Sequence, residues 1–500
     1  MERRAFLQSL AAGMALPLAA DAEPRRPLFV GQMMDALGFV RGGIDPVLDD
    51  VVARTAANAL LLDVCWLSRD GEGRPLPGRV SRRFGDPARG VHMGRVSPRF
   101  YRDTGFDPAD LPVSNPHGVD LLAALRDALG NRGMRLVALV KDIMPGETPG
   151  IDVIQEHDFD GTRAATVCKN NPFYRKFLRG LMADLIESYR VDGILYMAER
   201  QGPFLDTLGA RFRGRHRGLP GARTCFCSHC RATARARGID VDRAVQGFHA
   251  LAAFVADGRA RRKPLDGYHV TFWRLLLEYP ELLAWERMWH DNVRETLRIL
   301  YDRVKQVNAS VLFGSHVWHN HIMSPIYRAA QDLSALAPYH DFLKLSLYRN
   351  SGGARMASYV ESVGETIYGD VPPSELLQFH YRVFDYDEAP YETLRRTGLK
   401  GDFVYRESKR ALAHAAGSAM MVLPAVDVDI PILSADLDGR DPEAVARNTR
   451  QDVAEAFGQA LRAGVPGVIV SREYTEMTPD HLSGVGDAVR SYIGPESSRR

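Results

Sequence analysis

Short apolar runs alternate with amphipathic segments along most of the chain, and this alternation restricts the possible folds more than any other feature. Continuous apolar runs are typical of parallel strands buried on both faces, and parallel strands need a crossover, usually a helix, between them. Eight such units predict an α/β fold, a closed (β/α)8 TIM barrel, with an open doubly wound sheet as the alternative. The runs lie at residues 27–34, 59–66, 134–142, 193–197, 311–318, 342–348, 420–426 and 467–471.

Two long connections interrupt the pattern. The first follows the second run and is rich in Arg, Gly and Pro up to about residue 116, and the second follows the fourth run at residues 200–265. We therefore expect one barrel domain over residues 23–495, with insertions after strands two and four. Neither G-x-G-x-x-G after the first run nor G-x-x-x-x-G-K-[ST] occurs, so we expect no organic cofactor of the nucleotide type.

The first 22 residues read as an export signal. Arg3 and Arg4 precede Phe6-Leu7 and an apolar run that ends in Ala20-Asp21-Ala22, a small-residue cleavage pattern. The paired arginines resemble a twin-arginine signal, and the apolar run is too short to span a bilayer. The sequence predicts a mature protein that is exported to the periplasm or beyond.

Charge is nearly balanced, with 64 Lys and Arg against 62 Asp and Glu, for a net charge of +2. A nucleic-acid-binding protein normally carries a clear basic excess. We therefore expect no nucleic-acid partner.

Polar and aromatic side chains follow nearly every apolar run. In a barrel of this kind the active site lies at the carboxyl ends of the strands. Carboxylates, aromatic rings, histidines and amides at one mouth suit a polyhydroxylated ligand, so a carbohydrate substrate is predicted. The candidate substrate-binding residues are Asp63, Trp66, Lys141, Arg200, His316, Trp318, His319, Asn320, Tyr348, Arg349 and Arg472.

The segment DGILYMAER, followed by TCFCSHC at residues 224–230, resembles the family 42 β-galactosidases and related barrel glycosidases, including exported bacterial proteins assigned as glycosyl hydrolases. The resemblance implies that Glu199, after the fourth strand, is the general acid/base of a retaining glycosidase. It also implies a structural zinc site. The implied ligands are Cys225, Cys227 and Cys230, with Cys168 upstream.

A glycosidase needs a second carboxyl group opposite the first. Strands four and seven face one another across a barrel, so Asp427 and Asp429 are candidates, and Asp429 is favoured because it lies farther toward the mouth. Glu473, after the eighth strand, is the rival, since neighbouring Arg472 could lower its pKa.

Three alternatives stay open. Two of the four clustered cysteines could form a disulfide in an exported protein. His316, His319 and His321 could bind a catalytic metal, because imidazoles are common ligands of catalytic zinc. The barrel could also bind a carbohydrate without cleaving it.

Overall fold

The computed structural model describes residues 27–34, 38–39, 42–64, 97–104, 120–141, 151–211, 223–429 and 448–494. The predicted signal segment 1–22 and Trp66 lie outside these residues, and so do most residues of the connection after the second strand. The described helices include none that is both long and apolar enough to cross a membrane.

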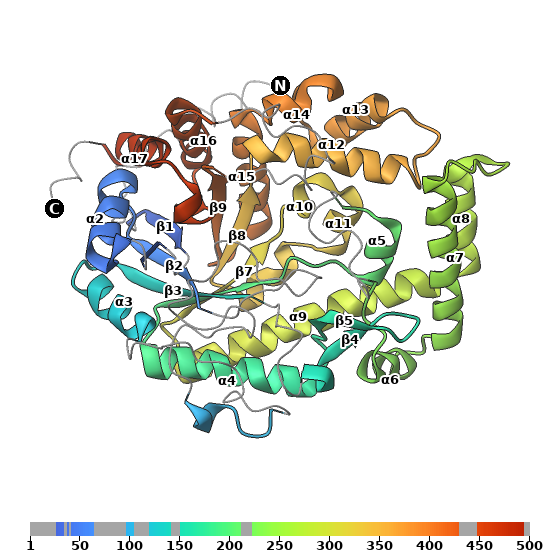
Figure 1. The fold of residues 1–500 in the computed structure, drawn as a ribbon, viewed down its shortest axis with the longest axis horizontal. Helices are drawn as coiled ribbons and strands as arrows, with labels where there is room; N and C mark the ends of the chain where they lie inside the picture. Colours follow the sequence, from blue (N-terminus) through green and yellow to red (C-terminus); the bar gives the residue numbers. More distant parts are fainter. Residues whose placement is uncertain are drawn as a thin grey trace, which may run out of the picture.

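Eight parallel strands close into a barrel, as the alternation of the sequence predicts (Figure 1). The order around the barrel is β1-β10-β9-β8-β7-β6-β3-β2, and hydrogen bonding between β1 and β10 closes the ring. This closure excludes the open doubly wound sheet. The barrel strands are β1 Phe29–Met34, β2 Ala59–Asp63, β3 Arg135–Lys141, β6 Gly193–Met197, β7 Leu312–Val317, β8 Phe342–Leu347, β9 Met421–Asp427 and β10 Gly467–Ser471.

Helices surround the ring and cover the outward faces of the strands (Figure 1). Their amphipathic faces pack on the barrel, as in the contacts of α15 with β9 and of α9 with β7. The helices are α2 Ile44–Thr55, α3 Leu121–Gly130, α4 Pro172–Tyr189, α5 Pro203–Leu208, α6 Ser228–Ala236, α7 Val241–Arg259, α8 Gly267–Glu278, α9 Glu281–Val307, α10 Asn320–Met323, α11 Pro325–Ala330, α12 Asn350–Gly364, α13 Pro373–Phe384, α14 Tyr391–Thr397, α15 Gly401–Ala415, α16 Arg450–Arg462 and α17 Pro479–Ile493.

The region before and after β6 extends the molecule beyond the barrel, at the right of Figure 1. Helices α5, α6 and α7 fall within the predicted insertion at residues 200–265. A two-stranded antiparallel hairpin, β4 Gln155–His157 and β5 Arg163–Val167, precedes β6 and was not predicted from the sequence. Its strands are too short to show a clear alternation of apolar and polar residues.

The barrel interior is apolar toward the amino ends of the strands and polar toward their carboxyl ends. Successive side chains of a strand point to opposite faces, so alternate residues of each strand point inward. On β8, Phe342 belongs to the interior cluster, whereas Leu343, Leu345 and Leu347 pack outward against helices. Lys344 and Ser346 therefore share the inward face with Phe342. The same alternation brings polar residues inward at the carboxyl ends of the other strands: Asp63, Lys141, His316, Asp427 and Ser471.

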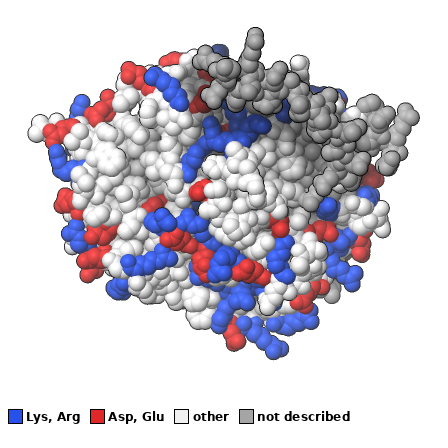
Figure 2. Space-filling model, turned by 180° about the vertical axis from the view of Figure 1, so that it is seen from behind, with Lys and Arg blue, Asp and Glu red and all other residues white. Residues whose placement is uncertain are grey.

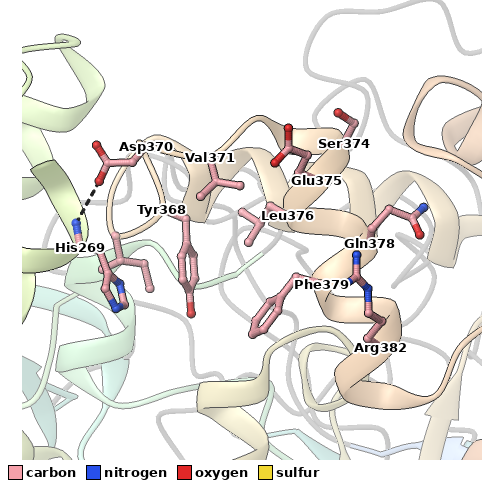
Figure 3. A pocket seen from close by; sticks show the side chains of 11 residues that line it. His269, Tyr368, Asp370, Val371, Ser374, Glu375, Leu376, Gln378, Phe379 and Arg382 are labelled. Carbon is pink, nitrogen blue, oxygen red and sulfur yellow. Dashed lines mark hydrogen bonds between the residues drawn. The ribbon is translucent and has the colours of Figure 1, made fainter.

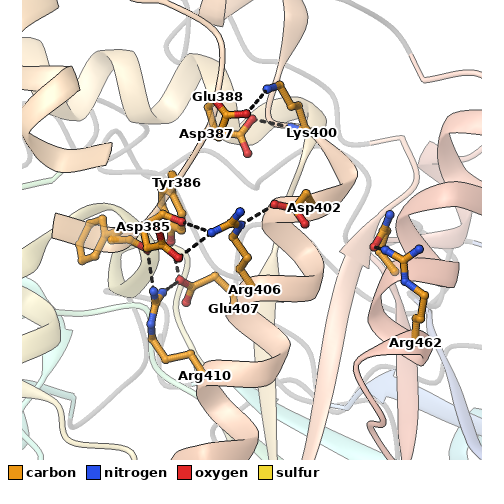
Figure 4. A network of polar contacts seen from close by, with 12 residues as sticks. Asp385, Tyr386, Asp387, Glu388, Lys400, Asp402, Arg406, Glu407, Arg410 and Arg462 are labelled. Atoms are coloured by element: carbon orange, nitrogen blue, oxygen red, sulfur yellow. Dashed lines mark hydrogen bonds and ion pairs between the residues drawn. The ribbon is translucent and has the colours of Figure 1, made fainter. Parts of the chain in front are cut away.

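Helix α15 is fixed to the preceding helices by a buried carboxylate, Glu407, which is 2% exposed. Its oxygens accept hydrogen bonds from Tyr386 Oη at 2.6 Å and from Arg328 at 3.0 Å, and Arg410 pairs with it as well. Figure 4 shows Tyr386, Glu407 and Arg410 of this network, with Arg406 bridging Asp385 and Asp402 beside them. Every charge in the network has a partner, so these residues can be buried without a ligand to balance their charges.

Candidate active site

Glu199 lies just beyond the end of β6, at the mouth of the barrel, with 44% of its side chain exposed. Oε1 of Glu199 lies 3.2 Å from Nε2 of His316, which comes from the end of β7 and is almost fully buried. Nδ1 of the same imidazole lies 3.3 Å from Nζ of Lys344, which is 0% exposed. The three side chains form a chain of contacts from the exposed mouth into the barrel interior.

The electrostatic surroundings keep Glu199 ionised. Partial removal of water by the surrounding protein would raise the pKa of Glu199, but the His316 contact and the charges of Lys344 and Arg355 hold it well below its ordinary value. Burial and the charge of Lys344 lower the pKa of His316 to about 4. At neutral pH, therefore, a neutral imidazole faces a carboxylate. An ionised carboxylate suits a nucleophile or a base, whereas a proton donor has to be protonated.

Glu473 belongs to the same cluster of charges. It follows β10, is 6% exposed, and Oε1 lies 3.9 Å from Nζ of Lys141. The charges of Glu199 and Glu473 both act to raise the pKa of Lys344, so both carboxyl groups influence the same interior cation. Lys141 is itself paired with Asp63, so these two predicted substrate-binding residues do lie in the mouth.

Asp427 has a structural role at the start of helix α12. Its carboxylate accepts hydrogen bonds from the backbone N–H groups of Arg349, Asn350 and Ser351, at 2.7, 3.0 and 3.2 Å. These donors begin helix α12, whose first N–H groups need partners outside the helix. The contacts occupy Asp427 as an anchor for that helix and leave its proposed catalytic role unsupported.

Replacing Asp427 with alanine should therefore destabilise the protein. Three N–H groups at a buried helix start would lose their acceptor, which should cost about 2–4 kcal/mol of unfolding free energy. Asp427→Asn, which keeps one acceptor oxygen, should lose less. Urea unfolding measures both, with the exposed Asp302→Ala as control; equal stability of Asp427→Ala and wild type would contradict this role.

Asp429 is turned away from the mouth. Strand β9 ends at Asp427, so the rule that alternate strand residues point the same way does not extend to Asp429. Its carboxylate lies 2.7 Å from Nδ1 of His481 and accepts the N–H of Thr478 at 3.1 Å. Asp429, favoured by the sequence, therefore binds residues at the start of α17.

Tyr348 and His319 stack on one another at the rim of the interior, with ring centroids 5.2 Å apart. The hydroxyl of Tyr348 lies 3.2 Å from Oγ of Ser471, and the Arg355 guanidinium lies 5.3 Å from the ring centroid. Both rings are buried, so they support the mouth from behind.

Trp318 and Asn320 were also predicted to bind substrate but are committed to packing. Trp318 is buried and meets Tyr327 edge-on at 5.8 Å between ring centroids. Nδ2 of Asn320 donates to Oε1 of Gln201 at 2.9 Å and to the carbonyl of Ala210 at 3.1 Å. Asn320 therefore fixes the segment that follows Glu199.

The histidines after β7 do not converge on a metal. His316 contacts Glu199 and Lys344, His319 stacks on Tyr348, and His321 meets the edge of Tyr327. Within the described ranges, the four clustered cysteines are the one group of histidine, cysteine and acidic residues close enough to share a metal ion. The metal-hydrolase alternative therefore has no site among these residues.

Arg200 points away from the mouth. Its guanidinium pairs with Glu156 of the hairpin and donates to Oγ1 of Thr224 at 2.9 Å. The prediction that Arg200 binds substrate is therefore not supported, since its side chain instead ties the residue after Glu199 to the hairpin and to the residue before Cys225.

Removing this tie should cost stability, because Glu156 is 1% exposed and would be left as a buried charge. Arg200→Met should lower the free energy of unfolding by about 3–5 kcal/mol. Adding Glu156→Gln to that variant removes the stranded charge and should recover part of the loss. Chemical denaturation of the three proteins checks this, and a double variant no more stable than the single one would contradict it.

Two further arginines of the predicted site are paired within the protein. Arg349 donates to Oδ1 of Asn448 at 2.9 Å. Arg472 forms an ion pair with Glu476 through Nε, at 3.0 Å, and through Nη2. Arg349 thus fixes the start of α16, and Arg472 still adds positive charge to the mouth through its effect on Lys344.

The four predicted cysteine ligands come together beside the hairpin. Their Sγ atoms all lie within 4.8 Å of one another, and all four residues are buried. Sγ of Cys168 lies 3.6 Å from that of Cys230 and 3.5 Å from that of Cys227, far longer than a disulfide bond. Tetrahedral zinc with Zn–S bonds near 2.3 Å would separate its sulfurs by about 3.8 Å, so the cluster fits such a metal.

Lys344, Arg355 and Ser346 are site residues that the sequence analysis missed. The signal for Lys344 was present, because a lysine in the apolar run FLKLSL shares the inward face with Phe342. Arg355 lies in the second turn of α12, away from any strand end, and only the packing of that helix brings its charge to Glu199.

A cavity of about 700 Å³ lies away from the strand ends, between α8 and α13. Figure 3 shows Tyr368 and Phe379 turned into it, with Glu375, Gln378 and Arg382 along α13. None of its lining residues comes from a barrel strand. It is therefore distinct from the mouth where Glu199 lies.

Comparison with solved structures finds barrel enzymes of low similarity. A β-galactosidase from Halorubrum lacusprofundi is 12% identical with a TM-score of 0.48, over 94% of this chain and 59% of its own. One from Bacillus circulans sp. alkalophilus is 10% identical with a TM-score of 0.43, over 92% of this chain and 55% of its own. A chitinase from Chromobacterium violaceum is 9% identical with a TM-score of 0.40, over 92% of this chain and 99% of its own.

The chain thus spans less than three fifths of the length of these two β-galactosidases. No family model and no curated protein sequence matches it. At these values the likeness says nothing about substrate, so function has to be inferred from the residues of this chain.

Proposed function

We propose that this protein is a glycoside hydrolase in which Glu199 and Glu473 are the two catalytic carboxyl groups. The observation that carries the proposal is the partly exposed Glu199 at the barrel mouth, 3.2 Å from His316, with the buried Glu473, which follows β10, beside Lys141. Hydrolysis of a glycosidic bond needs one ionised and one protonated carboxyl group on opposite sides of the bond. Asp427 and Asp429 are occupied elsewhere, which leaves Glu473 as the partner.

The ionised state of Glu199 favours the role of nucleophile over that of proton donor. The resemblance to family 42 enzymes implied the opposite role, but a donor needs a raised pKa and the surroundings of Glu199 lower it. A carboxylate held by a neutral imidazole can attack the anomeric carbon and leave as the glycosyl-enzyme intermediate is hydrolysed. The proposed mechanism is therefore retaining.

Glu473 takes the role of proton donor. Lys141, whose Nζ lies 3.9 Å from Oε1 of Glu473, pairs more closely with Asp63, and the guanidinium of Arg472 pairs with Glu476. Oε2 of Glu473 is buried and has no hydrogen-bond partner among the described residues. A sugar bound in the mouth would exclude water from the reaction, and this carboxyl group would give its proton to the leaving oxygen.

The cysteine cluster is proposed to bind one structural zinc ion and to take no part in the chemistry. Four thiolates close the coordination shell, so no position is left for a water or substrate. If the first 22 residues are a twin-arginine signal, the protein crosses the membrane already folded. The metal would then be bound in the reducing cytoplasm before export.

A panel of aryl glycosides with good leaving groups tests the proposal. The wild type should release the phenol from at least one sugar configuration. Binding of sugars without any cleavage would favour a carbohydrate-binding barrel instead. Glu473→Gln should keep activity toward the best leaving groups, which need no proton, and lose it toward poor ones.

Azide separates the two roles, because a small anion can take the place of a missing carboxylate. In Glu199→Gly it should restore turnover and give a glycosyl azide of inverted configuration. In Glu473→Gly the product should keep the configuration of the substrate. The reverse pattern would assign the roles the other way round.

A further inference from the structure

Lys344 is a buried cation that the two-carboxylate mechanism does not use. It lies on β8 inside the barrel, above Phe342, and is 0% exposed. Nζ contacts Nδ1 of His316 at 3.3 Å and Oγ of Ser346 at 3.5 Å. Burying an ammonium group costs free energy unless its hydrogen bonds are made, so a lysine at this position is expected to have a specific role.

A ligand in the mouth cannot reach Lys344, because the residue exposes no surface. Any effect on the reaction therefore passes through its neighbours. Burial lowers the pKa of Lys344 to about 8, while Glu199 and Glu473 act to raise it, so the group is still mainly protonated at pH 7.

The contact with His316 fixes where the imidazole proton lies. An ammonium group can only donate hydrogen bonds, so Nδ1 of His316 has to be the acceptor. The proton of the neutral ring is then on Nε2, the atom that lies 3.2 Å from Oε1 of Glu199. Nε2 is buried and not aligned for a hydrogen bond in the free protein, an arrangement that often tightens when a ligand binds.

We propose that Lys344 is a positioning residue that acts through His316, holding the imidazole in its Nε2–H form so that it faces and keeps ionised the carboxylate of Glu199. The tautomer follows from the contact between His316 and a protonated Lys344. Only the benefit to catalysis rests on the proposed function of Glu199.

Other charges face the same groups. Arg355 from α12 also favours ionised Glu199, Lys141 from β3 disfavours protonation of His316, and Glu473 and Arg472 after β10 act on Lys344 in opposite directions. Lys344 contacts His316 directly, so its removal should change the protonation of the His316–Glu199 pair. The His316–Glu199 pair would then bind its first proton at a higher pH.

The first test needs no enzymatic activity. In protein labelled with ¹⁵N-histidine, one of the 15 histidines should be a neutral Nε2–H imidazole at pH 7 that disappears in His316→Gln. In Lys344→Met its protonation midpoint should rise by about one pH unit or more. Lys176→Met, the same change at an exposed site on α4, should leave it unchanged.

The second test uses the hydrolysis of the aryl glycoside that the wild type prefers. The acid limb of the kcat/KM profile should move to higher pH in Lys344→Met and stay in place in Lys176→Met. A purely structural lysine would lower the amount of folded protein without moving the limb.

An Nδ1–H tautomer in the wild type, or an unchanged His316 midpoint in Lys344→Met, would overturn the proposal. The wild-type spectrum decides the tautomer even if the variant does not fold. Absence of any glycoside hydrolysis would count against the proposed function alone, because the spectra do not depend on turnover.

Discussion

Glu199→Gln should lower kcat/KM toward aryl glycosides by at least about a thousandfold while sugar binding persists. Glutamine keeps the shape of glutamate but cannot carry the negative charge that attacks the anomeric carbon. The loss should appear in kcat, because the interaction is made in the transition state. Initial rates and product-inhibition constants measure the two effects separately.

The matched control is Glu295→Gln on the outer face of α9, which should leave the kinetics unchanged. A Glu199→Gln enzyme that retains a tenth or more of wild-type turnover would show that this carboxylate does not perform the reaction.

Loss of one cysteine ligand should have the largest effect on stability. We expect Cys227→Ser to lose the bound metal and at least about 4 kcal/mol of unfolding free energy, because binding of a structural zinc ion contributes directly to folding. The cluster lies among α6, the hairpin and α9. There the rings of Phe226 and Trp285 stack with their centroids 4.3 Å apart, and Nε1 of Trp285 donates to the carbonyl of Cys225. Its loss would therefore loosen several elements together.

Metal content and thermal unfolding test this expectation, with Ser228→Ala on the exposed first turn of α6 as control. A strong chelator should destabilise the wild type and a thiol reductant should not. The opposite response, with no metal in the purified protein, would support the disulfide alternative.

The nearly balanced charge of the sequence is also seen at the surface, which carries side chains of both signs. Figure 2 shows acidic and basic side chains interspersed over the described residues of one face. The absence of a nucleic-acid partner stays a prediction.

The barrel was predictable because its eight strands are continuous apolar runs. This pattern can be recognised in the sequence without knowing any tertiary contact. Placing Glu199 at the mouth followed from its position after a strand. The direction of the Asp429 side chain could not be predicted, because the rule that alternate residues share a direction stops where the strand stops, at Asp427.

Arg200 and Arg355 show what strand positions cannot give. Arg200 follows a strand but turns to Glu156 on a hairpin that the sequence pattern did not indicate. Arg355 acts on Glu199 from a helix 156 positions further along the chain. Such placements depend on long-range packing, so they could only be found once the fold was known.

Trapping of the reaction intermediate tests the central claim most directly. A 2-deoxy-2-fluoro glycosyl fluoride of the preferred sugar should inactivate the enzyme. The fluorine at C2 slows both formation and hydrolysis of the glycosyl-enzyme, whereas the reactive fluoride leaving group speeds formation alone, so the intermediate accumulates. Mass spectrometry of the digested protein should find the sugar on Glu199. A label on another carboxylate, or an active enzyme that forms no label, would contradict the assignment of Glu199 as the nucleophile.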